Sequence, residues 1–284
     1  MEKIKTKRKV NIPLIIASII IGLYGVSLLL PLGWGLIMSL KKPLDYYVDM
    51  LSFPKPLQFK NYLQAFKELD AEGTGLGVMI WNSLWFSLGG TIATVLTSMI
   101  AGYVCANYKF AFCKVWYWIA VITMMIPIMG SLGSALKVSM SLGLFDSPLT
   151  LLTGFSALGS TFVISYAFFK GVDWGYAESA FIDGAGHLRV LFQIMLPQAT
   201  SPMIALCLTT FIAKWSDATG PLVYLPSYPT LASGFYMYEM ISGRNSNYPV
   251  LFAGLFMSAI PIVALYIAFQ DKLMNLNMGG GLKG

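Results

Sequence analysis

The residues whose types and spacing suggest a defined chemistry lie in a polar interval, 171–197, between two apolar stretches. A Glu-Ser-Ala triplet is followed by three residues and a glycine, and nine residues later by Ile-Met-Leu-Pro. Ala177, Ala180 and Gly184 recur at i, i+3 and i+7, which places them on one face of a helix. Small side chains on one face let another backbone approach closely. The chemistry predicted for this interval is therefore the docking of a partner protein.

The same interval predicts its own local structure. A short helix is expected first, then a turn at Gly184 and Gly186, then a second helix that leads into the next apolar stretch. Taken alone, Glu178 would be read as a solvated helix carboxylate, so its interest depends on the whole pattern. The residues of this interval that we single out by their pattern are Glu178, Ser179, Ala180, Asp183, Gly184, Ile194, Leu196 and Pro197.

Enzymatic chemistry finds little support in the sequence. His187 is the only histidine, and without a Cys or paired acidic residues at ligand spacing it predicts neither a metal site nor a catalytic dyad, so we read it as a polar turn residue. Cys105, Cys113 and Cys207 lack disulfide or metal-ligand spacing. No Gly-x-x-x-x-Gly-Lys-Ser/Thr loop occurs, so ATP hydrolysis would have to reside in another protein. We expect no catalytic, cofactor-binding or metal-binding residue.

One further pair of charges stands beside an apolar run. Lys214 precedes Asp217 by three residues, so the two can pair on one face of a helix. Charges at membrane depth are costly and usually face a cavity or a partner, which makes Lys214 and Asp217 candidates for a translocation path. The alternative is that both lie at the outer interface with their charged ends in water.

The elements that must position these residues are membrane helices. Of the 284 residues, 56% are hydrophobic and 11% charged, and the mean hydropathy is +0.67, whereas a soluble domain is about one quarter charged. The net charge of +6 does not indicate nucleic acid, because five basic residues crowd into positions 3–9, just before an apolar run. They are typical of the cytoplasmic flank of a first span, and the run that follows is too long for the core of a signal peptide.

Windows without charge predict an all-α integral membrane protein with six transmembrane helices, because a bilayer core needs about 20 apolar residues per helix. The short helix between the fourth and fifth spans would lie in the cytoplasm, and the resemblance described below implies that it is a cytoplasmic coupling helix. Residues 1–284 would form one transmembrane domain, with the interval 171–197 as a cytoplasmic loop and 271–284 as a tail. Residues 218–238 contain three prolines and are predicted to form an outer loop. With six spans both termini lie in the cytoplasm. The predicted spans are 12–40, 79–106, 115–136, 149–170, 196–216 and 248–270.

The spacing of the docking residues resembles the EAA loop of inner-membrane permeases of ABC importers, with Ser179 in place of the second alanine. Other short elements are similar to the carbohydrate-uptake branch, and in particular to permeases like the maltose-system G subunit. These elements are Asn82-Ser83, Ala101-Gly102-Tyr103, Trp215-Ser216-Asp217 and the ending Gly280-Gly281-Leu282-Lys283-Gly284. Trp-Asn-Asp is commoner in that branch than the Trp-Ser-Asp found here.

The resemblance implies a mechanism. In such permeases the EAA helix sits in a cleft of an ATPase subunit and transmits its closure to the membrane helices. Glu178 would meet a basic residue of the ATPase, Ala180 and Gly184 would permit close packing, and Ile194, Leu196 and Pro197 would anchor the return into the bilayer. The tail residues Gly281, Leu282, Lys283 and Gly284 would reach between paired ATPase subunits, or form a flexible end.

The resemblance also implies partners. They are a second, homologous permease subunit, two ATPase subunits that bind ATP and Mg²⁺, and an extracellular or periplasmic solute-binding protein. The expected solute is a sugar or oligosaccharide, and the expected location is the bacterial cytoplasmic membrane. Two other functions are weighed against this reading. A secondary transporter or channel would typically place ionisable residues in several spans, and an intramembrane enzyme would cluster His, acidic, Ser or Cys residues at depth.

Overall fold

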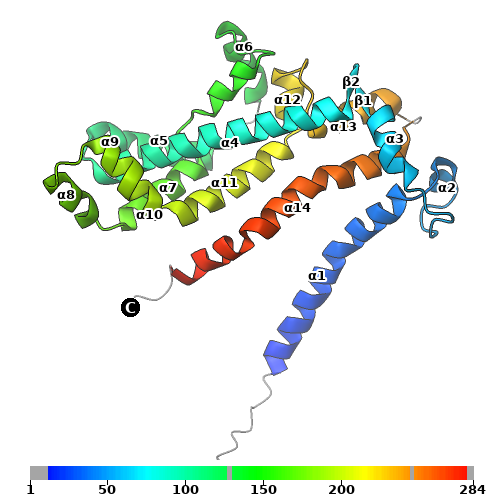
Figure 1. Cartoon of the computed structure of the whole chain (residues 1–284), viewed down its shortest axis with the longest axis horizontal. Helices are drawn as coiled ribbons and strands as arrows, with labels where there is room; N and C mark the ends of the chain where they lie inside the picture. The colour runs from blue at the N-terminus through cyan, green and yellow to red at the C-terminus, as the bar shows by residue number, and fades with distance from the viewer. Residues whose placement is uncertain (1–11, 127–129, 244–245, 280–284) are drawn as a thin grey trace, which may run out of the picture. The chain divides into compact units, whose positions relative to one another are not determined.

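The computed structural model describes residues 12–126, 130–243 and 246–279. The chain forms two compact units, one of residues 1–65 and 246–257 and one of residues 66–245 and 258–284. Nearly all described elements are helices (Figure 1), which confirms the predicted all-α class.

The first unit contains α1 (Ile12–Ser39), α2 (Pro43–Val48), the start of α3 (Lys60–Glu68) and the start of α14 (Tyr248–Gly279). Aromatic rings fasten α14 within this unit, because Trp34 meets Phe252 edge to face and Tyr46 stacks on Tyr248. The Asn61 side chain donates to the backbone carbonyls of Ser39 and Lys41, 2.7 and 2.8 Å away. The beginning of α3 is thereby held against the end of α1.

The second unit is built around α4 (Leu76–Asn107), which packs along α7 (Ser160–Gly171) and α11 (Thr200–Trp215). Two short strands, β1 (Asp70–Ala71) and β2 (Thr74–Gly75), form an antiparallel hairpin just before α4. The remaining elements are α5 (Ala111–Met125), α6 (Ser131–Ser141), the 3₁₀ helix η1 (Pro148–Gly154), α8 (Gly175–Ile182), α9 (His187–Val190), the π-helical turn η2 (Leu191–Met195), α10 (Leu196–Gln198), α12 (Thr219–Tyr224) and α13 (Leu231–Ser242).

A glycine sets the closest approach between α4 and α7. A Cβ atom on Gly102 would lie 2.7 Å from Cβ of Ser165 and 2.9 Å from the backbone of Ser165 and Tyr166. Real Cβ atoms do not approach other heavy atoms so closely, so only glycine fits here. Small residues at such contacts are how membrane helices pack without a hydrophobic driving force between them.

Three described helices are long and apolar enough to cross a membrane: Ile16–Ser39, Leu76–Asn107 and Tyr248–Gln270. They correspond to the predicted spans 12–40, 79–106 and 248–270. The predicted span 196–216 corresponds to α10 and α11. The segment His187–Gln198 and the helix Thr200–Trp215 also pass as one apolar span, bent by 78° at the break.

The two other predicted spans are each built from two helical pieces, so the expectation of one continuous helix in each is corrected. Within 115–136, α5 ends at Met125 and α6 begins after Gly130, which has a φ of +80°. Within 149–170, η1 ends at Gly154, and α7 begins after Gly159, also at +80°. A residue with a positive φ interrupts a right-handed helix, and a count of apolar residues cannot predict where such a residue will occur. Six membrane crossings remain a prediction.

The predicted outer loop 218–238 is also corrected, because most of it is helical. Pro221 lies in the first turn of α12, where a proline's missing N–H breaks no helical hydrogen bond. Pro226 and Pro229 fall between α12 and α13. A capping box then starts α13, in which the side chains of Thr230 and Ser233 each accept a backbone N–H of the other residue.

Candidate coupling site

The predicted docking interval forms a helical hairpin, α8 and α9, whose turns are defined by local hydrogen bonds. The Asp173 carboxylate accepts the N–H of Gly175, the first residue of α8, at 3.0 Å. At the other end, the N–H of Gly184 bonds to the carbonyl of Phe181 at 3.0 Å, and the N–H of Ala185 to that of Ala180 at 2.9 Å. This pair of bonds is a Schellman motif, and Gly184 supplies its left-handed residue with a φ of +82°. The predicted helix–turn–helix is confirmed.

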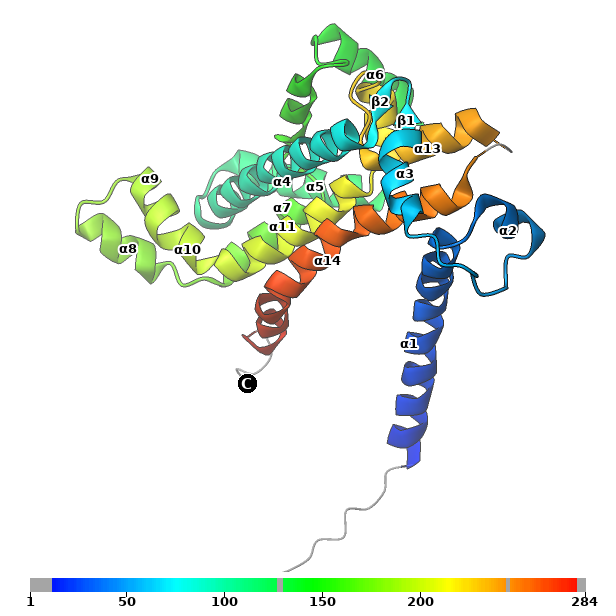
Figure 2. The same cartoon turned by 45° about the vertical axis from the view of Figure 1, so that its right-hand side comes forward.

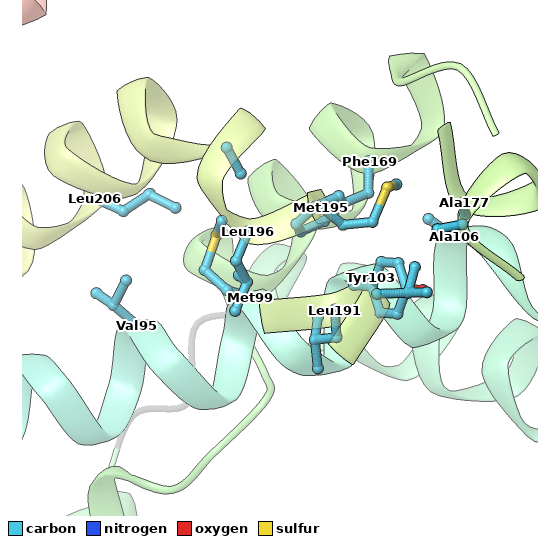
Figure 3. Close-up of a cluster of buried hydrophobic side chains, with 13 residues drawn as sticks. Val95, Met99, Tyr103, Ala106, Phe169, Ala177, Leu191, Met195, Leu196 and Leu206 are labelled. Atoms are coloured by element: carbon cyan, nitrogen blue, oxygen red, sulfur yellow. The ribbon is translucent and has the colours of Figure 1, made fainter. Parts of the chain in front are cut away.

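The inner face of the hairpin packs on its own chain. Ala177 is fully buried and Ala180 is 8% exposed. Both belong to a cluster of buried side chains that joins the hairpin to α4, to α7 and to residues 191–199, which follow the hairpin and are called the returning segment below (Figure 3). Its members are Val95, Met99, Tyr103, Ala106, Phe169, Ala177, Ala180, Val190, Leu191, Met195, Leu196, Ala199 and Leu206. In this chain the close approach that Ala180 allows is therefore to the chain's own helices.

The segment that follows the hairpin passes through a π-helical turn. The N–H of Leu196 bonds to the carbonyl of Leu191, five residues back, and Pro197 follows directly. Met195 and Leu196 are buried, Ile194 is partly buried and Pro197 is exposed. Figure 3 shows Met99 and Tyr103 of α4 facing this segment. The chain then bends by 78° before α11. Anchoring of the return by Ile194, Leu196 and Pro197 stays a prediction.

An aromatic cluster attaches the hairpin to the end of α4. The Tyr108 hydroxyl lies 2.7 Å from Nδ1 of His187, and the rings of Trp174 and Phe181 contact these two residues. Lys170, at the end of α7, donates to the carbonyl of Ala106 at 3.0 Å and satisfies an otherwise free carbonyl in the last turn of α4. His187 is thus part of the attachment, more than the polar turn residue we expected.

The outer face of the hairpin combines exposed polar side chains with one exposed apolar side chain. Glu178, Ser179, Asp183 and Gly184 are all exposed. Ile182 lies among them with 85% of its surface exposed. Glu178 stands in the first turn of α8, where a carboxylate is favoured by the helix dipole. Two carboxylates around an exposed isoleucine suit a protein contact, and among the described residues no group of three metal-ligating side chains occurs.

The second candidate pair, Lys214 and Asp217, lines a cavity of about 120 Å³ between α4, η1, α11 and α12. The two side chains take different partners there. The Lys214 ammonium lies 5.5 Å from the ring centre of Phe86, whereas the Asp217 carboxylate accepts the N–H of Gly220 at 2.9 Å. Asp217 thereby bonds to the first turn of α12. The predicted contact of the two charges on one helix face is replaced by a shared cavity.

Several residues on which the family resemblance rested form side-chain to backbone hydrogen bonds between elements of the second unit. Asn82 donates to the carbonyl of Pro229 at 3.0 Å, and the Ser83 hydroxyl accepts the N–H of Leu231 at 2.7 Å. Trp215 donates to the carbonyl of Ser258 at 3.0 Å. Gly281, Leu282, Lys283, Gly284 and the basic residues of positions 3–9 lie outside the described residues.

Sequence reasoning missed the role of Gly102 in packing and that of Lys170 in capping. A signal for the first was present, because Ser98, Gly102 and Ala106 are small residues at four-residue intervals in an apolar helix. Lys170 gave no comparable signal, since its partner lies 64 residues away along the chain.

Comparison with known proteins gives one family and a set of distant relatives. The family described as "Binding-protein-dependent transport system inner membrane component" matches residues 95–273. The chain is 25% identical over 262 residues to the diacetylchitobiose uptake system permease protein NgcG of Streptomyces coelicolor, covering 91% of this chain and 85% of that protein. It is 26% identical to the arabinooligosaccharides transport system permease protein AraQ of Halalkalibacterium halodurans, covering 84% of each.

A solved structure has the same fold. One chain in the crystal structure of a bacterial ABC transporter involved in the import of the acidic polysaccharide alginate superposes with a TM-score of 0.76 at 20% identity. The match covers 94% of this chain and 98% of that one.

Proposed function

Because this chain belongs to the family of binding-protein-dependent transport system inner-membrane components, we propose that it is the permease subunit of an ATP-driven carbohydrate importer. As a member of that family it is a multi-pass protein of the bacterial inner membrane. The α8–α9 hairpin is proposed as the element through which a separate ATPase moves the membrane helices.

The solute class is supported by the named transport systems of relatives. NgcG belongs to a diacetylchitobiose system and AraQ to an arabinooligosaccharide system, and each matches more than four fifths of this chain. The polar lining around Lys214 and Asp217 is compatible with a hydroxylated solute. We keep these two residues as candidates for the translocation path.

The observation that carries the coupling proposal is the division of the hairpin into two faces. Ala177 and Ala180 are buried against α4, α7 and the returning segment, so a displacement of the hairpin is transmitted to these elements through close-packed contacts. Glu178, Ile182 and Asp183 face outward and are free to meet another protein. A partner that grips the outer face would therefore move the inner face and the helices packed on it.

This assignment sets the orientation. The hairpin end of the second unit would face the cytoplasm, and the end with α6 and α12 would face outward, with both chain termini cytoplasmic. ATP hydrolysis would take place in two partner ATPase subunits. A homologous second permease and a solute-binding protein would complete the importer, and the tail residues 281–284 would add a contact with the ATPases.

Co-purification with the ATPase tests the proposal. Glu178→Lys should leave the permease inserted in the membrane but lower the amount of ATPase that a tag on the permease retains, because the charge that faces the partner is reversed. Glu239→Lys on α13 is the matched control, since it makes the same charge reversal at an exposed residue of the opposite end. Equal ATPase recovery with both variants would refute the coupling role of the hairpin.

A further inference from the structure

A second cavity, larger than that of Lys214 and Asp217, lies beneath α6. Its volume is about 340 Å³, within the range of pockets that hold small molecules. It adjoins the smaller cavity, because Thr150, Thr153 and Tyr224 line both. We call it the α6 pocket, and its lining residues are Ala135, Val138, Ser139, Leu142, Leu144, Thr150, Thr153 and Tyr224.

Ser139 is the residue of this pocket whose buried hydroxyl lacks a hydrogen-bond partner in the described part of the chain, and a ligand could supply one. Its side chain is 5% exposed, and its hydroxyl has no hydrogen-bond partner among the described residues. A buried hydroxyl without a partner is uncommon, because it has lost its bonds to water and gained none. Two residues further along α6, Ser141 is exposed and its hydroxyl donates to the carbonyl of Val138 at 2.8 Å. The unsatisfied state is therefore a property of the pocket and not of serine on this helix.

The remaining polar groups define what the ligand must offer. The Thr150 hydroxyl donates to the carbonyl of Leu144, and that of Thr153 donates to the carbonyl of Thr150. Both threonine oxygens are left as acceptors, so a ligand must donate to them. In the adjoining cavity the ammonium of Lys214 can only donate and the carboxylate of Asp217 can only accept.

Most of the remaining residues that line the α6 pocket have apolar side chains, namely Ala135, Val138, Leu142 and Leu144. A ligand that suits these walls carries several groups that both donate and accept, together with faces of C–H groups. A sugar ring has this combination, with hydroxyls around its rim and apolar faces above and below.

In the proposed orientation, the pocket lies on the outer side of the membrane, from which the solute would arrive. Within the second unit, α6 and α12 lie well away from the α8–α9 hairpin in both views (Figures 1 and 2). Asp146 holds the wall of the pocket in place, because its N–H bonds to the carbonyl of Tyr224 and its carboxylate accepts the N–H and hydroxyl of Ser227.

We propose that the α6 pocket is a sugar-binding subsite of this permease, which holds one ring of the solute before it enters the membrane. Ser139 and the two threonines bind the hydroxyls of that ring, while Lys214 and Asp217 bind the part that extends into the smaller cavity. This inference rests on the proposed function and adds to it that this subunit contacts the solute directly.

Saturation-transfer NMR on the assembled importer in nanodiscs tests the subsite, with maltose, cellobiose and diacetylchitobiose as the probes. We expect at least one of the three to bind the unaltered complex. Ser139→Ala should weaken that binding about fivefold, the usual effect of one lost hydrogen bond. Ser141→Ala, the same change at the exposed serine, should leave it unchanged. Ala135→Trp fills the mouth of the pocket from an exposed position and should abolish it.

Equal affinity in the Ser139, Ser141 and Ala135 variants would overturn the subsite, as would the absence of binding by all three sugars. Uptake by the complete importer with its binding protein and ATP separates this failure from that of the proposed function. If sugar is imported and the KM of uptake is the same in Ser139→Ala and Ala135→Trp, the subsite is wrong and the importer assignment stands. If the assembled importer carries no sugar, the proposed solute class itself is wrong.

Discussion

The turn at Gly184 gives the sharpest test of how the coupling hairpin is built. Gly184 has a φ of +82°, and a Cβ added there would meet no atom within 4 Å. Gly184→Ala therefore introduces no clash, and its cost is the left-handed backbone alone, about 1–2 kcal/mol. Because the Schellman bonds of Gly184 and Ala185 hold the end of α8, we expect this cost to appear as local opening of the hairpin.

Hydrogen–deuterium exchange of the purified permease in nanodiscs measures that opening. A loss of about 1–2 kcal/mol corresponds to exchange faster by about 5- to 30-fold at the amide of Ala185. Gly184→Asn should recover much of the protection, because asparagine tolerates the left-handed region better than alanine does.

Gly186→Ala is the control at a neighbouring position. Gly186 has a φ of −77° and equally open surroundings, so the same added methyl group meets no backbone strain. If Gly184→Ala and Gly186→Ala changed the exchange of Ala185 equally, backbone strain at Gly184 would not be what fixes the turn. If Gly184→Ala opened the hairpin but left ATPase recovery intact, the geometry of the turn would be irrelevant to coupling.

Two further variants test packing and loop attachment. Gly102→Ala forces a Cβ against Ser165 and should cost about 1–3 kcal/mol, which would lower the thermal unfolding midpoint in detergent. Gly77 lies on the same helix, but a Cβ added there would meet no atom within 4 Å, so Gly77→Ala should leave the midpoint unchanged or raise it. A similar fall of the midpoint in both variants would reject the close-packing argument. Asp146→Gly accommodates the positive φ of residue 146 and removes the carboxylate, so the amide of Ser227 should exchange about fivefold faster or more. Unaltered exchange at Ser227 would show that the carboxylate does not hold this loop.

The features that depend on neighbouring residues could be predicted from the sequence. The helix–turn–helix of the docking interval follows from glycine spacing and helix preference, which act over a few residues, and the structure has it. The long apolar helices α1, α4 and α14 were equally visible, because a continuous stretch of apolar residues needs no knowledge of its partners. The motif spacing also led to the family, which the match over residues 95–273 confirms.

The breaks within the third and fourth predicted spans were not visible to a count of apolar residues. Gly130 and Gly159 adopt positive φ values in the structure, whereas Gly102 sits inside a regular helix. The sequence shows a glycine in all three places. A Cβ on Gly102 would clash with Ser165, whereas one on Gly130 or Gly159 would meet no atom within 4 Å, and this difference is visible only in the structure.

The direction of each side chain was likewise decided by the tertiary structure. Ala180 points into its own chain because α4, α7 and the returning segment converge there. Asp217 accepts the N–H of Gly220 in α12, whereas the Lys214 ammonium lies over the ring of Phe86. The hydroxyl of Ser139 is left without a partner in a pocket whose walls come from α6, η1 and α12. Local spacing determines which turns and helices can form, since it acts through the backbone of adjacent residues. Burial depends on segments tens of residues apart, and only their packing shows which face of a helix remains for a partner.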